Sequence, residues 1–280
     1  CCQHNHAQGW PYFTEHLVLA TPDNGVATAI YAACKATVKV GDGKEITLHE
    51  ETNYPFEEAI AFTVSTGEKV AFPFYLRIPS WTQKAEVRVN GKKVSAAPVA
   101  GKYLCINREW ANGDRVELTL PMSLSMRTWQ VNKNSVSVDY GPLTLSLKIA
   151  EKYVEKDSRE TAIGDSKWQK GADSKKWPTT EIYPDSPWNY SLVLDKKEPL
   201  KNFKVIRKSW PADNYPFTVA SVPLEVKAIG RPVPEWKIDE TGLCGVLPEE
   251  DAVKGDKEEI TLIPMGAARL RISAFPNTKE

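Results

Sequence analysis

The sequence predicts a mainly β fold, with two antiparallel β-sandwich domains preceded by one N-terminal helix. Short segments in which apolar and polar residues alternate recur from residue 26 onward, and turns with Gly, Asn or Asp separate them. No helical segment lies between these strands, so they are expected to pair in antiparallel sandwiches or barrels. The nine Trp, ten Tyr and twenty Pro residues also favour strands and turns over a helical bundle.

Residues 3–20 form the one segment in which a long helix is expected. Trp10, Phe13, Leu17 and Ala20 recur at spacings of three and four, which would give a helix one apolar face. The run from Thr21 to Gly25 contains Pro and Gly, which end helices. We therefore assign residues 1–22 to a terminal helix.

Residues 23–150 are expected to form the first β-sandwich domain. Its clearest turn is Asn90-Gly91, which lies between alternating strands and supplies the two positive-φ residues of a type I′ turn. Burial of alternate apolar side chains would hold the domain together. The strand segments expected in it are 26–40, 45–51, 59–64, 70–78, 86–94, 103–107, 116–120, 126–131 and 135–149.

The remaining chain divides into a polar stretch and a second β region. Residues 151–186 are rich in Lys, Asp, Ser and Gly, and we expect an irregular linker or surface excursion there. Residues 187–280 return to alternation and are expected to form a second, smaller β-sandwich domain. Its strand segments are expected at 191–194, 203–206, 222–229, 259–263 and 270–275.

Charge and hydropathy argue against two classes of partner. The 36 basic and 36 acidic side chains cancel and form no basic stripe, so no nucleic acid is expected. No run approaches the length of apolar sequence that crosses a bilayer, so no membrane segment is expected, and no signal peptide is visible. Free thiols favour a reducing compartment such as the cytoplasm, whereas metal ligation would protect thiols in a periplasmic or secreted protein, so the compartment stays open.

The first six residues hold two adjacent thiols, Cys1 and Cys2, and two of the four histidines, His4 and His6. Two thiolates with further ligands could hold zinc, which prefers four N, S or O donors. Structural zinc sites usually separate their cysteines, so the alternative is two thiols packed near a helix start. A helix N-terminus would itself lower the pKa of a thiol and favour the reactive thiolate.

Other side chains with potential acid or base chemistry are interpreted as structural. His16 is expected on the helix, and His49 on a strand in contact with solvent. The pairs Glu50-Glu51 and Glu57-Glu58 could supply an acid and a base, but neighbours on a strand point to opposite faces. No nucleophile elbow, P-loop or dinucleotide-binding glycine motif is present.

Two further groups of side chains are expected in the core. We interpret Trp81, Trp110, Trp129 and Trp236 as core residues rather than sugar-binding platforms. Cys34, Cys105 and Cys244 lie among apolar or small neighbours and are expected to be buried free thiols. Five widely spread cysteines do not form a disulfide framework.

An ordered set of short segments resembles the C-terminal part of the glycoside hydrolases related to β-L-arabinofuranosidases, glycoside hydrolase family 127, long described as a domain of unknown function. The resemblance runs from end to end of the chain. The segments are Cys1-Cys2-Gln3-His4-Asn5 with Gly9-Trp10-Pro11, Asn53-Tyr54-Pro55-Phe56, Leu76-Arg77-Ile78-Pro79-Ser80-Trp81, Val87 to Gly91, Arg108-Glu109-Trp110 with Gly113-Asp114, and Ile263-Pro264-Met265-Gly266 with Leu270-Arg271-Ile272 and Phe275-Pro276.

This resemblance implies a parent protein in which an (α/α)₆ catalytic barrel precedes β-sandwich domains. The helix at residues 3–20 would be the last barrel helix, and the chain, which begins on Cys1 rather than Met, would be a piece of that parent. By position, Cys1 would be the catalytic nucleophile and a zinc ligand, and Cys2 a zinc ligand. The other zinc ligands, a Glu and a Cys, and the acid/base Glu would lie in the barrel, outside this chain.

The function implied is that of the C-terminal β-sandwich portion of a zinc-dependent, cysteine-nucleophile retaining glycosidase acting on plant-type glycans. Its partners would be the carbohydrate substrate and the barrel, and the chain alone is expected to be inactive. The alternative is a non-catalytic β-sandwich module that binds carbohydrate or supports the barrel. Trp168, Trp177 and Trp188, in the loop-rich region, are the candidate sugar platforms of that alternative.

Overall fold

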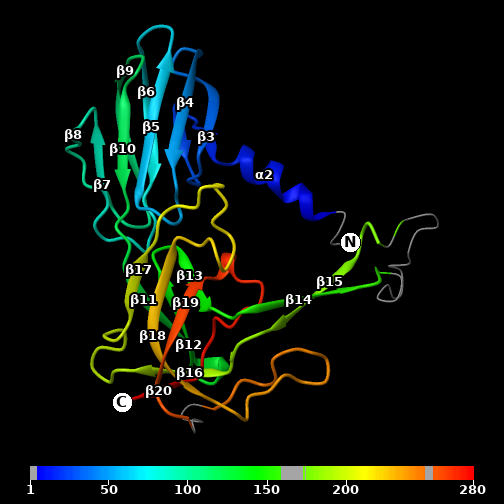
Figure 1. The fold of residues 1–280 in the computed structure, drawn as a ribbon. Helices are drawn as coiled ribbons and strands as arrows, with labels where there is room; N and C mark the ends of the chain where they lie inside the picture. Colours follow the sequence, from blue (N-terminus) through cyan, green and yellow to red (C-terminus); the bar gives the residue numbers. More distant parts are fainter. Residues whose placement is uncertain (1–4, 159–172, 174, 250–254) are drawn as a thin grey trace. The chain divides into compact units, whose positions relative to one another are not determined.

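The computed structural model describes residues 5–158, 173, 175–249 and 255–280. The described chain is mainly β, as expected, and divides into two compact units, Cys1–Ser123 and Leu124–Glu280 (Figure 1). The division falls earlier than residue 150, because the strands after Ser123 pair with strands near the C-terminus. No helix in the described ranges combines the length and apolar character that a membrane crossing requires.

The first unit is a sandwich of two sheets that share one core. One sheet has the order β1-β2-β6-β9 and the other β3-β4-β5-β10-β7-β8, with antiparallel neighbours except for the parallel pair β2 and β6. The strands are β1 Val18–Ala20, β2 Val26–Thr28, β3 Cys34–Val40, β4 Lys44–Thr52, β5 Ala59–Thr66, β6 Val70–Arg77, β7 Glu86–Val89, β8 Lys92–Lys93, β9 Tyr103–Trp110 and β10 Arg115–Thr119.

Aromatic side chains join the two sheets of the first unit. Phe62 of β5 packs edge-on against Phe74 of β6, with ring centroids 5.4 Å apart. Trp110 of β9 is 0% exposed, stacks on Phe72 at 5.6 Å, and donates its indole N–H to the Phe72 carbonyl at 3.0 Å. The expected core position of Trp110 is therefore confirmed, and the hydrogen bond satisfies the one polar atom of its ring.

The turn expected at Asn90-Gly91 forms the β7–β8 hairpin. Both residues have positive φ, 49° and 77°, as a type I′ turn requires. The Asn90 side chain also accepts a hydrogen bond from the Arg115 amide and donates one to Asp114. This residue therefore serves both the turn and the connection to β10.

The N-terminal helix is shorter than the expected span of 3–20. A 3₁₀ turn at His6–Gln8 leads into α2, Gly9–Glu15, and the chain is already extended at β1. Pairing with β2 satisfies the backbone of β1 and buries Leu17, which stabilises a strand where the apolar spacing favoured a helix. Trp10 and Phe13 remain exposed on α2, 62% and 39%.

The second unit contains one eight-stranded sheet, ordered β11-β12-β13-β19-β18-β16-β20, with β17 also paired to β18. Only the β16–β20 pair is parallel. The elements are β11 Leu124–Trp129, β12 Ser135–Tyr140, β13 Leu143–Leu147, β16 Tyr190–Leu194, β17 Lys204–Arg207, β18 Leu224–Pro232, β19 Glu258–Pro264 and β20 Asn277–Lys279, with 3₁₀ turns at Gln130–Asn132 and Met265–Ala267.

Main-chain hydrogen bonds between Val136 and Phe275 close this sheet on itself. The two residues exchange both N–H to carbonyl bonds, each 2.9 Å long. Phe275 precedes β20, so the end of the strand path bonds back to β12 near its start. Val136 and Phe275 belong to the core that the closed sheet surrounds.

The stretch 151–186, expected to be irregular, contains a hairpin at its ends. β14, Glu151–Lys156, pairs antiparallel with β15, Thr179–Pro184, over six residue pairs. Residues 159–172 and 174 lie outside the description. The β-branched and aromatic residues of β15 favour a strand, whereas the high Lys content of the whole stretch obscures this local pattern.

Trp110→Phe should lower the free energy of unfolding of the first unit by about 2–3 kcal/mol, because the ring loses volume and the Phe72 carbonyl loses a donor. Urea unfolding followed by circular dichroism measures this. Trp10→Phe, on the 62% exposed ring of α2, is the matched control and should change it by less than about 0.5 kcal/mol. Equal effects of the two substitutions would show that Trp110 is not a core anchor.

Candidate functional site

Cys1 and Cys2, predicted to hold zinc and supply the nucleophile, lie outside the described residues, as does His4. Among the residues that the structure describes, no group of three or more His, Cys, Asp or Glu side chains could hold a metal ion. The roles of Cys1 and Cys2 therefore stay predictions.

The two described histidines with side-chain surroundings are structural. The Nδ1 atom of His16 lies 2.6 Å from the Tyr12 carbonyl at the end of α2, and the side chain is exposed. His49 lies half-buried in the middle of β4, where Lys35 and Thr63 are its neighbours on the flanking strands. Neither histidine stands beside a nucleophile, so no acid–base pair forms here.

The other three cysteines are free thiols, but the expectation that all are buried is wrong. Cys34 is half-buried, whereas Cys105 and Cys244 are exposed. Cys105 takes an outward position of β9, where exposed and buried residues alternate. Cys244 pairs with Ile238 across an exposed turn. Apolar neighbours in sequence did not reveal the face on which each thiol lies.

Glu50 and Glu51 separate to opposite faces of β4, as expected, whereas Glu57 and Glu58 precede β5 and lie on no strand. Glu50 of β4 is 1% exposed, whereas the next residue, Glu51, faces solvent. Of the second pair, Glu58 accepts a hydrogen bond from the Met122 amide at 3.0 Å, and Glu57 is exposed. The structure therefore joins one member of each pair, Glu51 and Glu57, on a common surface.

Glu50 is an unusual group, because an ionisable carboxyl lies inside the sandwich. Its Oε2 atom is 3.9 Å from the Cys34 thiol, while its Oε1 atom has no hydrogen-bond partner among the described residues. Burial raises the pKa of the Glu50 carboxyl to about 8, against a partial lowering by the Ala32 amide and the Cys34 thiol. Burial likewise raises the pKa of the Cys34 thiol to about 11, and Glu50 adds to this rise.

This pair does not form an activated nucleophile. A reactive cysteine has a lowered pKa and a base that accepts its proton, whereas Cys34 and Glu50 both hold their protons at neutral pH. Nearby polar groups are used structurally: the Tyr31 hydroxyl donates to the Arg77 carbonyl at 2.5 Å, and Arg77 Nε donates to the Ala29 carbonyl at 2.6 Å. The cluster is a source of pH-dependent stability.

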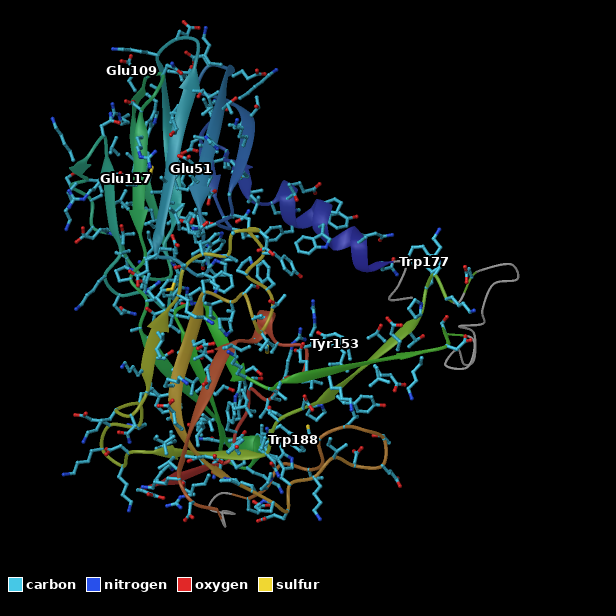
Figure 2. The ribbon with its side chains drawn as sticks, in the orientation of Figure 1. Glu51, Glu109, Glu117, Tyr153, Trp177 and Trp188 are labelled. Atoms are coloured by element: carbon cyan, nitrogen blue, oxygen red, sulfur yellow. The ribbon has the colours of Figure 1, made fainter. Side chains whose placement is uncertain are left out.

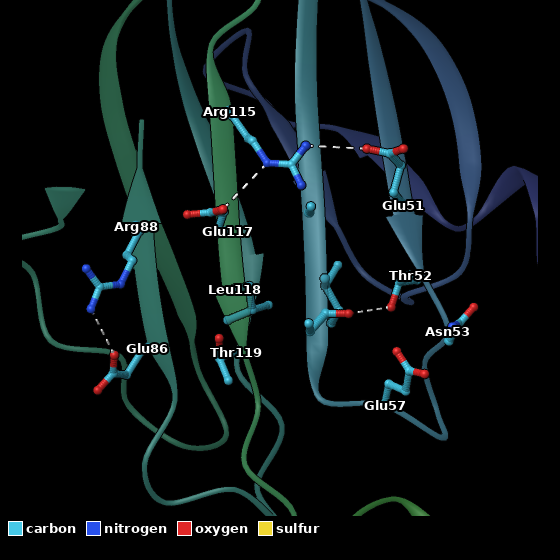
Figure 3. A pocket seen from close by; sticks show the side chains of 13 residues that line it. Glu51, Thr52, Asn53, Glu57, Glu86, Arg88, Arg115, Glu117, Leu118 and Thr119 are labelled. Carbon is cyan, nitrogen blue, oxygen red and sulfur yellow. Dashed lines mark hydrogen bonds and ion pairs between the residues drawn. The ribbon is translucent and has the colours of Figure 1, made fainter. Parts of the chain in front are cut away.

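A polar trough of about 530 Å³ lies on the outer face of the six-stranded sheet, β3-β4-β5-β10-β7-β8, of the first unit (Figure 3). The small side chains of Ala59 and Ala61 of β5 form the floor of the trough, and longer side chains of β4, β7 and β10 form its walls. It is lined by Glu51, Thr52, Asn53, Glu57, Ala59, Ile60, Ala61, Glu86, Arg88, Arg115, Glu117, Leu118 and Thr119.

The charges in this trough pair with one another. Arg115 lies 3.4 Å from Glu51 and 3.5 Å from Glu117, and Arg88 lies 3.7 Å from Glu86 (Figure 3). Glu51 of β4 and Glu117 of β10 lie on either side of Ala61 of β5, and Figure 2 labels both on this sheet. These groups are exposed to water, so the trough offers donors and acceptors to a polar surface rather than a site for proton transfer. Sequence reasoning missed Arg88, Arg115 and Glu117 because strand order brings them together.

The tryptophans divide between core and surface. Trp236 is 3% exposed and Trp81 is half-buried against the first core, as expected. Trp129 is 41% exposed, with the Arg127 guanidinium 5.0 Å from its ring centroid, so it is not the expected core residue. β11 is an edge strand of its sheet, which leaves this ring uncovered on one side.

The three candidate sugar platforms also separate. Trp168 lies outside the described residues. Trp177 is 64% exposed toward the far end of the β14–β15 hairpin, whereas Trp188 is half-buried near its base (Figure 2). Only Trp188, of the two that the structure describes, lines one of the larger hollows.

Comparison with known proteins confirms the resemblance that the sequence motifs indicated. Residues 25–122 match the family described as the middle domain of GH127 β-L-arabinofuranosidases. The chain therefore contains a β domain related to these enzymes. No curated protein matches the sequence.

Three solved structures share the fold along this chain. A GH127 β-L-arabinofuranosidase from Geobacillus stearothermophilus T6 is 21% identical with a TM-score of 0.63, and the match covers 100% of this chain and 37% of that one. A glycoside hydrolase is 20% identical with a TM-score of 0.64, covering 99% and 40%. A GH127 β-arabinofuranosidase is 22% identical with a TM-score of 0.57, covering 93% and 37%. The chain thus spans less than half of each of these proteins.

Glu50→Gln should flatten the dependence of stability on pH. The pKa of Glu50 is about 8 in the folded state and 4.5 ordinarily, so the folded state keeps a proton that the unfolded state loses. The free energy of unfolding of the natural chain therefore falls as pH rises from 4.5 to 8, and Gln removes roughly 5 kcal/mol of that fall.

The matched control is Glu51→Gln, on the exposed neighbour of the same strand. Urea unfolding of both variants at a series of pH values between 4.5 and 8 measures how the stability of each depends on pH, and only Glu50→Gln should differ from the natural chain. Parallel stability curves for Glu50→Gln and the natural chain would contradict a neutral, buried Glu50.

Proposed function

Because residues 25–122 match the middle domain of GH127 β-L-arabinofuranosidases, we propose that this chain is the C-terminal β portion of a zinc-dependent, cysteine-nucleophile retaining glycosidase acting on plant-type glycans. The observation that carries the proposal is this match, together with a fold shared along 100% of the chain with a GH127 enzyme. The glycan substrate and the hydrolytic activity are themselves part of what we propose.

In this proposal Cys1 is the nucleophile and a zinc ligand, and Cys2 is a second zinc ligand. Two thiolates are soft donors that suit zinc, so the donor set of the chain fits this metal. Zinc commonly takes four ligands. The resemblance to the family implies that the other two are a Glu and a Cys of the (α/α)₆ barrel. When bound, zinc keeps a cysteine sulfur ionised and makes it a better leaving group.

In the reaction, this chain would supply the Cys1 sulfur that attacks the anomeric carbon of the sugar. In a retaining mechanism, a nucleophile attacks the anomeric carbon from one side while an acid/base group on the other side protonates the leaving oxygen. A thiolate at Cys1 fills the first role, and a barrel Glu fills the second. Cys2 holds the metal, so that the position of the metal does not depend on the nucleophile alone.

The exposed aromatic residues of α2 support a barrel partner. Trp10 and Phe13 meet edge to face, with centroids 6.2 Å apart, and are 62% and 39% exposed. Burying such rings stabilises an association by the hydrophobic effect. A helix of the barrel is the natural partner for this surface in a protein that carries the rest of the GH127 architecture. The chain alone would then lack the complete active site and be inactive.

The second candidate function is a carbohydrate-binding or supporting module without catalytic activity. The half-buried Trp188 beside a hollow of the second unit favours the binding form of this alternative. Carbohydrate binding at this hollow and catalysis at Cys1 are compatible within one protein, because the hollow and the Cys1–Cys2 pair use different residues.

Cys1→Ser in the protein joined to its barrel should reduce kcat by about a thousandfold, because a hydroxyl is a much weaker nucleophile than a thiolate. Cys2→Ser should lower the zinc content as well as the activity. Hydrolysis of an aryl β-L-arabinofuranoside and metal analysis of the purified protein provide the two measurements, and the present chain alone should show neither hydrolysis nor stoichiometric zinc. Cys105→Ser, on an exposed thiol, is the control. Unchanged zinc and activity in both Cys1→Ser and Cys2→Ser would refute the assignment.

A further inference from the structure

A hollow of about 380 Å³ lies on the second unit, at the base of the β14–β15 hairpin. Tyr183 of β15, Trp188 before β16, Leu243 of the exposed turn, and Arg269 and Arg271 after β19 contribute to its lining. Its volume lies within the range of small-ligand sites, and apolar atoms predominate in its wall. We call it the Trp188 cleft.

The aromatic wall of the Trp188 cleft is held in place from behind. Trp188 meets Trp236 edge-on, with ring centroids 5.1 Å apart, and Trp236 is 3% exposed. The Trp236 indole donates to the Gly245 carbonyl at 3.0 Å, and Asn189 donates to the carbonyls of Val233 and Trp236. A ring fixed in this way loses little conformational freedom when a ligand packs on it.

The cleft also carries two positive charges. Arg269 and Arg271 lie in the irregular segment that follows the 3₁₀ turn at Met265–Ala267, and both line the cleft with exposed side chains. Arg271 Nε donates to the Ala268 carbonyl at 2.9 Å, and Arg269 interacts with the hydroxyls of Tyr153 and Tyr215. Neither guanidinium forms an ion pair within the described ranges, and no carboxylate lines the cleft.

Two carboxylates of the adjoining hairpin, Glu151 and Glu181, already have partners. Glu151 accepts hydrogen bonds from the Arg269 amide at 3.0 Å and from the Tyr153 hydroxyl at 2.6 Å. Glu181 accepts from the Tyr183 hydroxyl at 2.5 Å and lies 3.8 Å from Lys156. The two guanidiniums therefore remain the charged groups that a ligand in the cleft would meet.

We propose that the Trp188 cleft binds a ring that bears a carboxylate, namely a uronic acid residue of a glycan. The C–H face of the sugar would pack on Trp188, since an aromatic face is electron-rich, and the carboxylate would lie between Arg269 and Arg271. Guanidinium groups bind carboxylates through paired, charge-assisted hydrogen bonds. Only the choice of a plant glycan as the source rests on the proposed function; the ligand class follows from the cleft.

Isothermal titration of the 280-residue chain with methyl galacturonide, methyl galactoside and benzoate tests this ligand class. One sugar ring is expected to bind with a dissociation constant of about 1 mM, given the small number of atoms it contributes. The neutral galactoside should bind at least about tenfold more weakly, because it lacks the charged partner of the arginines. Equal binding of both sugars, or no binding of the uronide, overturns the proposal. Binding of benzoate without the uronide assigns the cleft to aromatic acids and overturns the sugar assignment.

Two substitutions locate the site. Arg271→Met, on an exposed side chain, should weaken uronide binding by about tenfold without unfolding the unit. Trp188→Ala should weaken both sugars. Arg88→Met and Trp129→Ala, on an exposed Arg and a 41% exposed Trp outside the cleft, are the matched controls and should leave binding unchanged. Unchanged binding in Arg271→Met would place the ligand elsewhere. Cys1→Ser should not alter uronide binding, so loss of the hydrolytic proposal would leave this one standing.

Discussion

The two-residue period of the β-strand is the constraint on which the rest of this structure depends. Along β4 it sends Glu50 into the core and Glu51 to the solvent, although the two are chemically identical neighbours. The same period exposes Cys105 on β9 and brings Arg115 and Glu117 of β10 to the face that carries the polar trough. For residues on these strands, the surroundings of a side chain are therefore set by the face on which its position falls.

This constraint explains what could be predicted from the sequence. The alternating segments and the Asn90-Gly91 turn were recognisable because their signals are local, and the structure has strands and a positive-φ turn there. The strand expected at 270–275 is the exception, because that segment contributes only the single bridge at Phe275. The end of the helix was not predictable in this way. Apolar spacing around Leu17 fits a helix, but pairing of β1 with β2 decides the conformation, and that pairing depends on residues six to ten positions away.

The candidate sites differ in the same respect. Cys1 and Cys2 were identified from the resemblance to a family, and composition and spacing left several alternatives for them. The polar trough and the Trp188 cleft each assemble residues that are far apart in sequence, so no local pattern marks them. A partial signal existed for the cleft, because Leu270-Arg271-Ile272 was one of the shared segments, but its partner Trp188 comes from another strand connection.

The bond pair between Val136 and Phe275 has a consequence for biosynthesis. It joins residues at opposite ends of the second unit, so the sheet of this unit cannot close until nearly the whole unit has left the ribosome. Contacts of such long sequence separation slow folding, and the unpaired edge of β12 is exposed in the meantime. The first unit has no such dependence on later residues, since its sheets are complete by β10. Synthesis from the N-terminus therefore allows the sandwich of the first unit to form before the sheet of the second unit closes.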